Sequence, residues 1–466
     1  MSVGASTVGD MNQLGVRRTA DQVLALAPDV ASREAGSRLG TAGPWSDAGC
    51  DGVGALWGLC EGSGSRPYRT VVDLAGPAPA SQCSCPSRKS PCKHALGLLL
   101  LWAAEDPVVT AGAEPAGWAG EWLRARRERA GARQEGVPAE PGGATAERTA
   151  DPEAARRRAE RRAARIESGA AELEQRLTDL LREGLASAER EGYGYWEQTA
   201  ARMVDAQAPG LAARVRELGA IPASGPDWPG RLLEECALLH LLDAAWLGRD
   251  RLPDALAATV RTRVGLPSAP AGPAVRDSWL VLAQYDQSDG KVTTRRIWLY
   301  GRDTGRTVLV LSFGAAGRAP EISLPVGLAV DAEVLPHGGA GQLRATLGER
   351  FGAPYEGGAL PRGAGVREAL EEYGRALRED PWLESVPVTL DGVVPVPVGE
   401  GWQLADADGK AALPVARGAV GRPGLWKLAA LSGGGPVAVF GECGHQGFQP
   451  LAAWGASDTG EPIPLL

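Results

Sequence analysis

The sequence predicts a multidomain α+β protein with a small ββα unit near the amino terminus, a helical middle region and a β-rich carboxy-terminal region. Three observations support this fold class. At 466 residues the chain is too long for one ordinary hydrophobic core. Its composition, 44% hydrophobic and 23% charged, is typical of globular proteins. Along the chain, apolar residues change from alternation to helical spacing and back to alternation.

The first region covers residues 1–105. Two short helices are expected within residues 19–39. Residues 55–74 contain two β-type runs joined by a Gly- and Ser-rich turn, and their period-2 pattern is that of a strand pair. The strongly apolar segment 95–104 predicts a helix. Together these elements form a ββα unit over about residues 56–102.

The middle of the chain divides into a linker and a helical region. Residues 106–153 show no hydrophobic periodicity beyond a short basic helix at 118–133, so we expect a largely disordered linker. From residue 154 to residue 265, apolar residues recur at helical spacing, with Pro209 and Pro222 as breaks. This second segment is therefore predicted to be a helical domain.

Residues 266–466 are predicted to form a β-rich domain. Short β-type runs begin near residue 279 and continue to residue 440, and Asp-Gly and Asp-Thr-Gly sequences supply turns between the first of them. One helix is expected near residues 366–377.

Charge and hydropathy restrict the classes of partner. The net charge of −8 provides no global positive field, so any contact with nucleic acid must be local. The first residues lack the pattern of a secretory signal, and the longest apolar run, 98–104, is shorter than the roughly 18–20 residues that span a bilayer. We therefore expect a cytoplasmic protein without membrane contact. In a reducing cytoplasm, clustered cysteines beside a histidine favour a metal site over disulfides.

Four metal-ligand side chains lie within twelve residues: Cys83, Cys85, Cys92 and His94. In an extended segment Cys83 and Cys85 point to the same side, and the loop that follows, with a proline at each end, returns the chain to Cys92 and His94 at the start of a helix. Structural zinc takes such Cys₃His sets in a tetrahedron. The alternative, four ordinary small buried residues, is disfavoured by their close clustering. We predict one structural Zn²⁺.

The charges around the cluster agree with bound zinc. No acidic residue lies between Asp73 and Glu105, whereas Arg88, Lys89 and Lys93 lie within the cluster. One Zn²⁺ with three thiolates leaves a charge of −1, which these cations offset while favouring the deprotonated thiols. Since all four ligands come from the protein, no coordination position stays open for water, and the ion is expected to be structural.

The pattern C-x-C-x₆-C-x-H, with a hairpin before it and an apolar helix after it, resembles the SWIM-type zinc finger. This resemblance covers about residues 56–102 and implies a ββα zinc fold in which the three cysteines and the histidine are the metal ligands. It further implies a DNA-binding or protein-interaction module. A second resemblance rests on residues 201–210. Through this stretch the longer chain is similar to bacterial SWIM proteins with helical and β-rich extensions, and this likeness implies no activity.

A second metal site is a weaker candidate. Cys236 and His240 are four residues apart on an expected helix, and Cys443 and His445 form a C-x-H sequence. Together they offer a Cys₂His₂ set. We favour the alternative that Cys236 is an ordinary buried thiol, because leucines surround it in the sequence.

The partner and the activity remain open at this point. Six arginines between Arg156 and Arg165, and others at 124–129, offer phosphate contacts in addition to Arg88, Lys89 and Lys93, although such runs are more often solvated helix faces. The other hypothesis is a protein partner that docks on the finger, with the other domains as scaffold. No phosphate loop, H-E-x-x-H or G-x-S-x-G motif occurs, so we expect no catalytic residues and no enzyme, although a β-rich domain with unrecognised activity stays an alternative.

Overall fold

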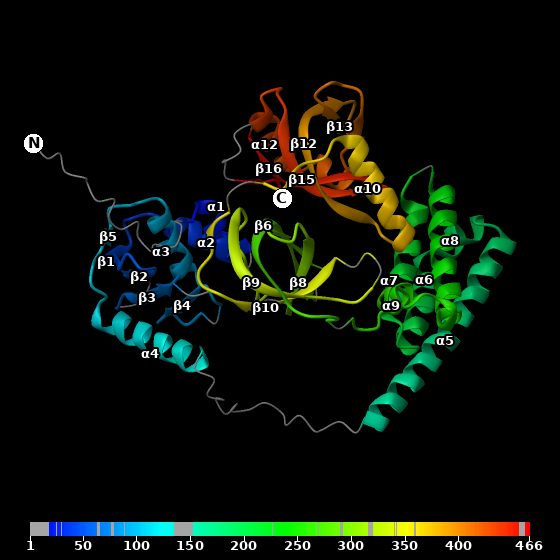
Figure 1. Cartoon of the computed structure of the whole chain (residues 1–466), viewed down its shortest axis with the longest axis horizontal. Coiled ribbons are helices and arrows are strands. Elements are labelled where there is room, and N and C mark those ends of the chain that lie inside the picture. Colours follow the sequence, from blue (N-terminus) through cyan, green and yellow to red (C-terminus); the bar gives the residue numbers. More distant parts are fainter. Residues whose placement is uncertain are drawn as a thin grey trace, which may run out of the picture.

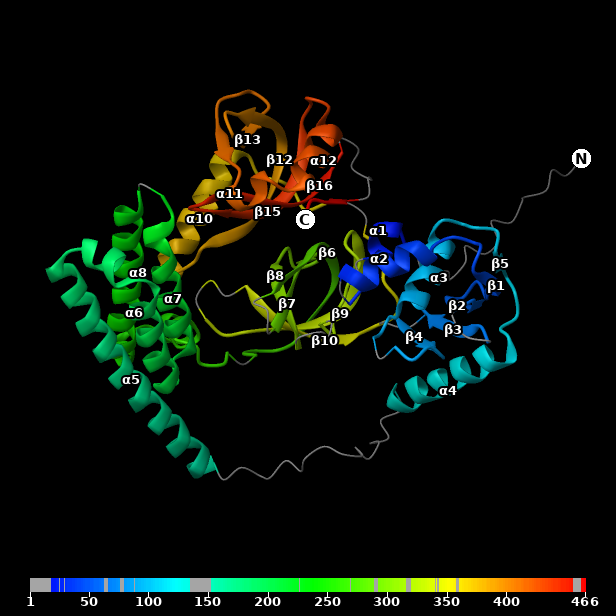
Figure 2. The same ribbon diagram turned by 180° about the vertical axis from the view of Figure 1, so that it is seen from behind.

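The computed structural model describes the chain from residue 18 to residue 466 with several gaps. The gaps are residues 25, 29, 63–65, 76–78, 88, 135–151, 226, 269, 289–291, 316–319, 340, 342, 358–359 and 456–461. Figures 1 and 2 show an amino-terminal unit, a central β-barrel and a helical unit in a row, with a carboxy-terminal sheet beside the barrel. The predicted α+β fold class, with its helical middle region and β-rich carboxy-terminal part, is confirmed.

The amino-terminal unit is a five-stranded sheet with helices on both faces. Its strands follow the order β4-β3-β2-β1-β5, and all pairs are antiparallel except β1 with β5. Helix α3 and the short helices α1 and α2 share one apolar core with this sheet. The elements are α1 Ala20–Leu24, α2 Val30–Leu39, β1 Trp45–Cys50, β2 Ala55–Cys60, β3 Tyr68–Asp73, β4 Ala80–Cys83, α3 Lys93–Ala103, β5 Val109–Ala111 and α4 Gly117–Gln134.

The ordered unit extends well beyond the expected ββα hairpin. The short basic helix expected at 118–133 is present as α4, but it packs on the sheet and is not part of a disordered linker. Residues 106–134 contain strand β5 and helix α4, and the helix buries Ala119 and Leu123 against Trp57 and Val71 on the second face of the sheet. The apolar face of α4 is short and interrupted by arginines, so the sequence of this helix shows no extended hydrophobic periodicity. Most of the remaining expected linker lies outside the described residues.

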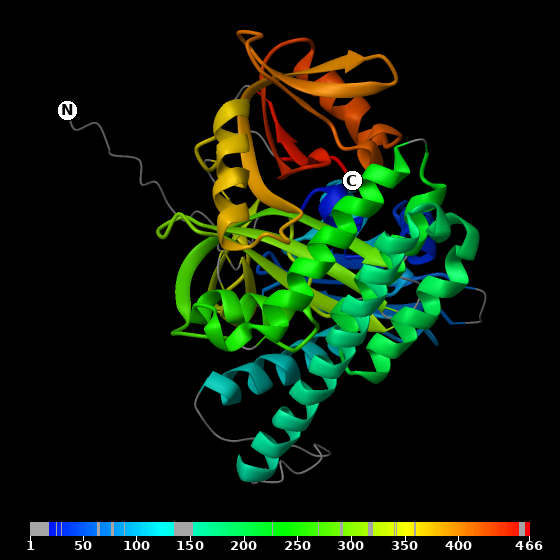
Figure 3. The ribbon, with the colours of Figure 1, turned by 90° about the vertical axis from the view of Figure 1, so that its right-hand side faces the viewer.

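The helical unit follows. The long helix α5 lines the core with Ile166, Ala170, Leu173, Leu177 and Leu180, which is the apolar stripe expected from the sequence. Trp196 and Trp246 fill the centre of this core. The helices are α5 Pro152–Glu183, α6 Ala186–Asp205, α7 Pro209–Ala220, α8 Trp228–Leu247 and α9 Asp254–Arg263, and Figure 3 shows this end of the molecule facing the viewer.

The β-rich region contains two separate sheets and not a single one. In the first sheet, β10 pairs in parallel with β8 and antiparallel with β9, and β9 also pairs with β6. The strands β6-β7-β8-β10-β9 therefore close into a barrel with the strand order of an OB fold. Trp279, Val281, Ile297 and Leu299 fill its interior. The strands are β6 Val275–Ser288, β7 Val292–Gly301, β8 Thr307–Ala315, β9 Leu328–Pro336, β10 Arg344–Arg350 and β11 Tyr355–Glu356.

The second sheet has the order β14-β13-β12-β15-β16-β17 and its own core, against which helix α10 packs. Helix α10 occupies the position predicted from the sequence. Phe440 and Leu451 of this sheet pack on Leu282 and Trp298 of the barrel. The elements are α10 Val366–Glu379, β12 Ser385–Val398, β13 Gly401–Asp406, β14 Ala412–Pro414, α11 Arg417–Val420, α12 Pro423–Ser432, β15 Val437–Gly444, β16 Gly447–Trp454 and β17 Ile463–Pro464. Within the described residues no helix has the length and apolar character needed to cross a membrane.

Candidate metal centre

The four predicted ligands come together at the junction of β4 and α3. Cys83 ends β4, Cys85 follows two residues later, Cys92 immediately precedes α3, and His94 lies in the first turn of that helix. Their ligand atoms all lie within 4.8 Å of one another. The structure therefore brings together all four residues that the spacing singled out.

The distances fit a tetrahedral zinc ion. Nδ1 of His94 lies 3.6 Å from Sγ of Cys83 and 4.0 Å from Sγ of Cys92. Zinc bonds of about 2.3 Å to sulfur and about 2.0 Å to nitrogen place tetrahedral sulfur and nitrogen ligands about 3.5 Å apart. The cluster is thus compatible with zinc held by three sulfurs and Nδ1 of His94, with every ligand supplied by the protein.

Strand β3 supports the ligands from behind. Thr70 is fully buried opposite Cys83 in the strand pairing, and its hydroxyl lies 3.2 Å from Sγ of Cys83. The ring of Tyr68 lies against the ring of His94, with the centroids 4.8 Å apart. Such contacts orient metal ligands and adjust the basicity of their donor atoms. Sequence reasoning did not assign these roles to Tyr68 and Thr70, which lie outside the twelve residues of the ligand pattern.

The thiols interact strongly with one another. Hydrogen bonding from Cys92 and His94 lowers the pKa of Cys83 to about 3, whereas the same bond to Cys83, together with burial, raises the pKa of Cys92. Burial also raises the pKa of Cys85. A bound divalent cation stabilises the thiolate forms of all three cysteines.

Two family models match the chain: the SWIM zinc finger over residues 68–103, and the SWIM-associated four-helix bundle domain over residues 161–264. The chain therefore contains a SWIM-type zinc finger and a SWIM-associated helical domain. The first match contains all four clustered ligands, and the second corresponds to the helical unit that begins in α5. No curated protein and no solved structure significantly matches this SWIM protein.

The second proposed metal set does not assemble in the SWIM protein. His240 bonds through Nδ1 to Glu174 of α5, whereas His445 lies 3.2 Å from the hydroxyl of Tyr373. Cys236 is buried in the helical core, and Cys443 is buried in the core of the carboxy-terminal sheet. Within the part of the chain that the structure describes, the only group of three or more clustered metal-ligating side chains is the one in the finger.

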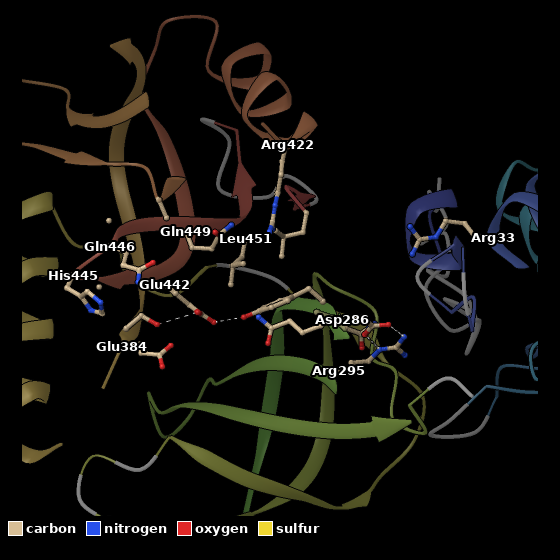
Figure 4. A pocket seen from close by; sticks show the side chains of 18 residues that line it. Arg33, Asp286, Arg295, Glu384, Arg422, Glu442, His445, Gln446, Gln449 and Leu451 are labelled. Carbon is tan, nitrogen blue, oxygen red and sulfur yellow. Dashed lines mark hydrogen bonds and ion pairs between the residues drawn. The ribbon is translucent and has the colours of Figure 1, made fainter. Parts of the chain in front are cut away.

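A polar cleft of about 660 Å³ separates the barrel from the carboxy-terminal sheet (Figure 4). Glu442 of β15 is one of the residues that line it. One oxygen of Glu442 accepts hydrogen bonds from the hydroxyl of Tyr285 at 2.7 Å and from the indole of Trp298 at 2.9 Å. Its other oxygen accepts one from Ser385 at 3.3 Å, and Arg296 forms an ion pair with the carboxylate. Glu442 thus joins the two sheets.

Proposed function

We propose that this SWIM protein binds nucleic acid and that the metal-binding loop, residues 84–93, contacts the phosphate backbone. The observation that supports this most is the distribution of charge around the ligands. Arg69, Lys89 and Lys93 are exposed at this end of the finger, and the loop itself contains no acidic residue. Arg88 also belongs to the predicted contact set but lies outside the described residues. Clustered cations are the basis of sequence-independent affinity for nucleic acid.

The packing of the finger favours the loop over the sheet as the contact surface. Helix α3 covers one face of the sheet and α4 covers the other, so the apolar hairpin face is not open to a protein partner. The outward face of β6, β7 and β8, with which OB-type barrels bind oligonucleotides, is partly occupied as well, because Trp298 and Leu309 are buried together with Phe440.

The basic helices contribute unequally to this proposal. In α4, Arg126 forms an ion pair with the buried Asp73 at 2.8 Å and Arg127 pairs with Asp51, so these two arginines fasten α4 to the sheet. In α5, Arg156 and Arg157 form ion pairs with glutamates of the same helix.

Three other arginines of α5 provide a second candidate contact. Arg158, Arg161 and Arg165 are exposed at spacings that place them on one helix face. They form no ion pair with an acid among the described residues. We propose that this face adds phosphate contacts to those of the metal-binding loop.

We also propose that the chain is a binding protein and not an enzyme. The zinc ligands are all protein side chains, which supports a structural ion. In the polar cleft, both oxygens of Glu442 are hydrogen-bonded to the protein itself, which makes this carboxylate a poor general base.

The test compares charge-reversal variants of the zinc-loaded protein in fluorescence-anisotropy titrations with single- and double-stranded DNA and RNA. We expect the affinity to fall steeply between about 50 and 200 mM salt. Lys89→Glu with Lys93→Glu is expected to weaken binding and to reduce the magnitude of the duplex-DNA salt slope by about 1.8, since each lost phosphate contact contributes about 0.9. Lys427→Glu is the matched control, because Lys427 is exposed on α12. Binding that ignores salt, or equal losses in the control, would refute the proposal.

A further inference from the structure

Helix α8 has an apolar outward face. Leu233, Leu241 and Leu247 are 49%, 43% and 41% exposed, although the opposite side of the same helix is fully buried in the helical core. An exposed helix face is ordinarily polar, and a continuous apolar one marks an interaction surface. We define the α8 stripe as the exposed residues that follow the alternating spacing of four and three: Leu233, Ala237, His240, Ala244 and Leu247.

We propose that a second copy of this chain covers the α8 stripe in an antiparallel helix pair. The order of the stripe is the same in both directions: leucine, alanine, histidine, alanine, leucine. A two-fold axis near His240 therefore places Leu233 opposite the partner's Leu247 and Ala237 opposite the partner's Ala244. Leucines then meet leucines at both ends, and the small alanines let the helices approach closely. A surface that complements itself in this way is what an isologous dimer requires.

The charged residues near the ends of α8 do not oppose this pairing. Arg231 lies on the side of the helix away from the stripe, and Arg249 is paired with Glu167 of its own chain at 3.3 Å. At the centre, Nδ1 of His240 lies 2.7 Å from a carboxylate oxygen of Glu174 in its own chain.

Helix α5 extends the apolar surface at one end. The ion pairs of Glu167 with Arg249 and of Glu174 with His240 define an antiparallel register between α5 and α8. In this register Leu181, which is 49% exposed, lies level with Leu233. The helical unit is also at the opposite end of the molecule from the finger (Figure 1), so pairing through α8 leaves the metal-binding loop open. The proposal does not depend on nucleic-acid binding.

Analytical ultracentrifugation of the full zinc-loaded chain, from about 1 to 100 μM, tests the proposal. We expect a reversible species of twice the 48.5 kDa chain mass. Leu233→Glu with Leu247→Glu is expected to leave only monomer. Leu370→Glu is the matched control, since Leu370 is 46% exposed on α10, and this variant should still dimerise. A wild-type chain that stays monomeric throughout, or a control that dissociates equally, would overturn the proposal.

Cysteine cross-linking tests the register separately. A two-fold axis at residue 240 brings the two copies of a His240→Cys variant together, so mild oxidation should yield a covalent dimer. The copies of a Leu233→Cys variant would be separated by about 21 Å along the helix axis, beyond the reach of a disulfide. Circular dichroism of both variants should show the helical signal of the wild type. Efficient cross-linking at residue 233 and none at residue 240 would exclude this arrangement, whatever mass the wild type shows.

Discussion

Replacing Cys92 with alanine tests the metal centre most directly. Cys92 is 4% exposed and is one of four ligands, so the substitution removes one metal bond without adding bulk to the core. Structural zinc sites in small fingers have apparent binding free energies of about 10–16 kcal/mol. A quarter of that, about 2.5–4 kcal/mol, corresponds to an affinity loss of roughly 60- to 700-fold. We therefore expect the variant to lose zinc to a moderate chelator that leaves the wild type loaded.

The same variant tests how far the finger depends on its ion. Eight of the eleven residues of α3 are buried, and they share a core with the sheet, so we expect the helix to stay folded without zinc. Protection from hydrogen exchange should be lost over residues 80–92 and kept in α3.

Cys60→Ala is the control for this experiment. Cys60 is fully buried in strand β2 of the same finger but lies outside the ligand cluster. The control should keep its zinc and lose only the modest stability that follows from a small core truncation, about 1 kcal/mol. Zinc retention by the Cys92→Ala variant at wild-type affinity, measured by mass spectrometry and chelator competition, would refute the assignment of Cys92 as a ligand.

Three further predictions concern the other units. Burial, together with the nearby Glu174, raises the pKa of Asp243 in α8 to about 8, whereas an aspartate in an unfolded chain has a pKa of roughly 3.9. The free energy of unfolding should therefore fall as the pH rises from about 4 to 8 and then level off. Asp243→Asn should abolish this fall and stabilise the protein at pH 8 by up to about 5 kcal/mol in urea denaturation. Glu442→Ala should cost about 3–5 kcal/mol by leaving its buried donors and Arg296 unpaired, and Glu442→Gln, which keeps an acceptor, should cost clearly less. Arg126→Gln should accelerate hydrogen exchange in α4 because it leaves Asp73 buried without its cation, whereas the exposed Arg124→Gln should have no effect.

The ligand cluster was predictable because its information is local. Cys83 and Cys85 are two residues apart in an extended segment, and Cys92 and His94 stand at a helix start, so twelve residues contain the whole pattern. The supporting contact of Thr70 depends on strand register, which the sequence of one strand does not reveal.

The wider architecture depends on contacts between distant residues. Strand β1, Trp45–Cys50, has the sequence WSDAGC, without the alternation that announces a strand, and it forms because β2 and β5 pair on its two sides. The barrel closes through the parallel pairing of Arg344 with Leu309, which are far apart in sequence. Local periodicity therefore predicted a β-rich region but not its division into a barrel and a second sheet.

Helices cover both faces of the finger sheet, and this determines the shortest fragment of the protein that can bind zinc and stay soluble. A polypeptide cut at residue 105 would retain every zinc ligand but would lose the helix that shields Trp57 and Val71. Its underside would then present a tryptophan and a valine to water, and such a fragment is expected to load metal and still aggregate. The shortest soluble metal-binding piece should therefore include Gln134, the last residue of α4.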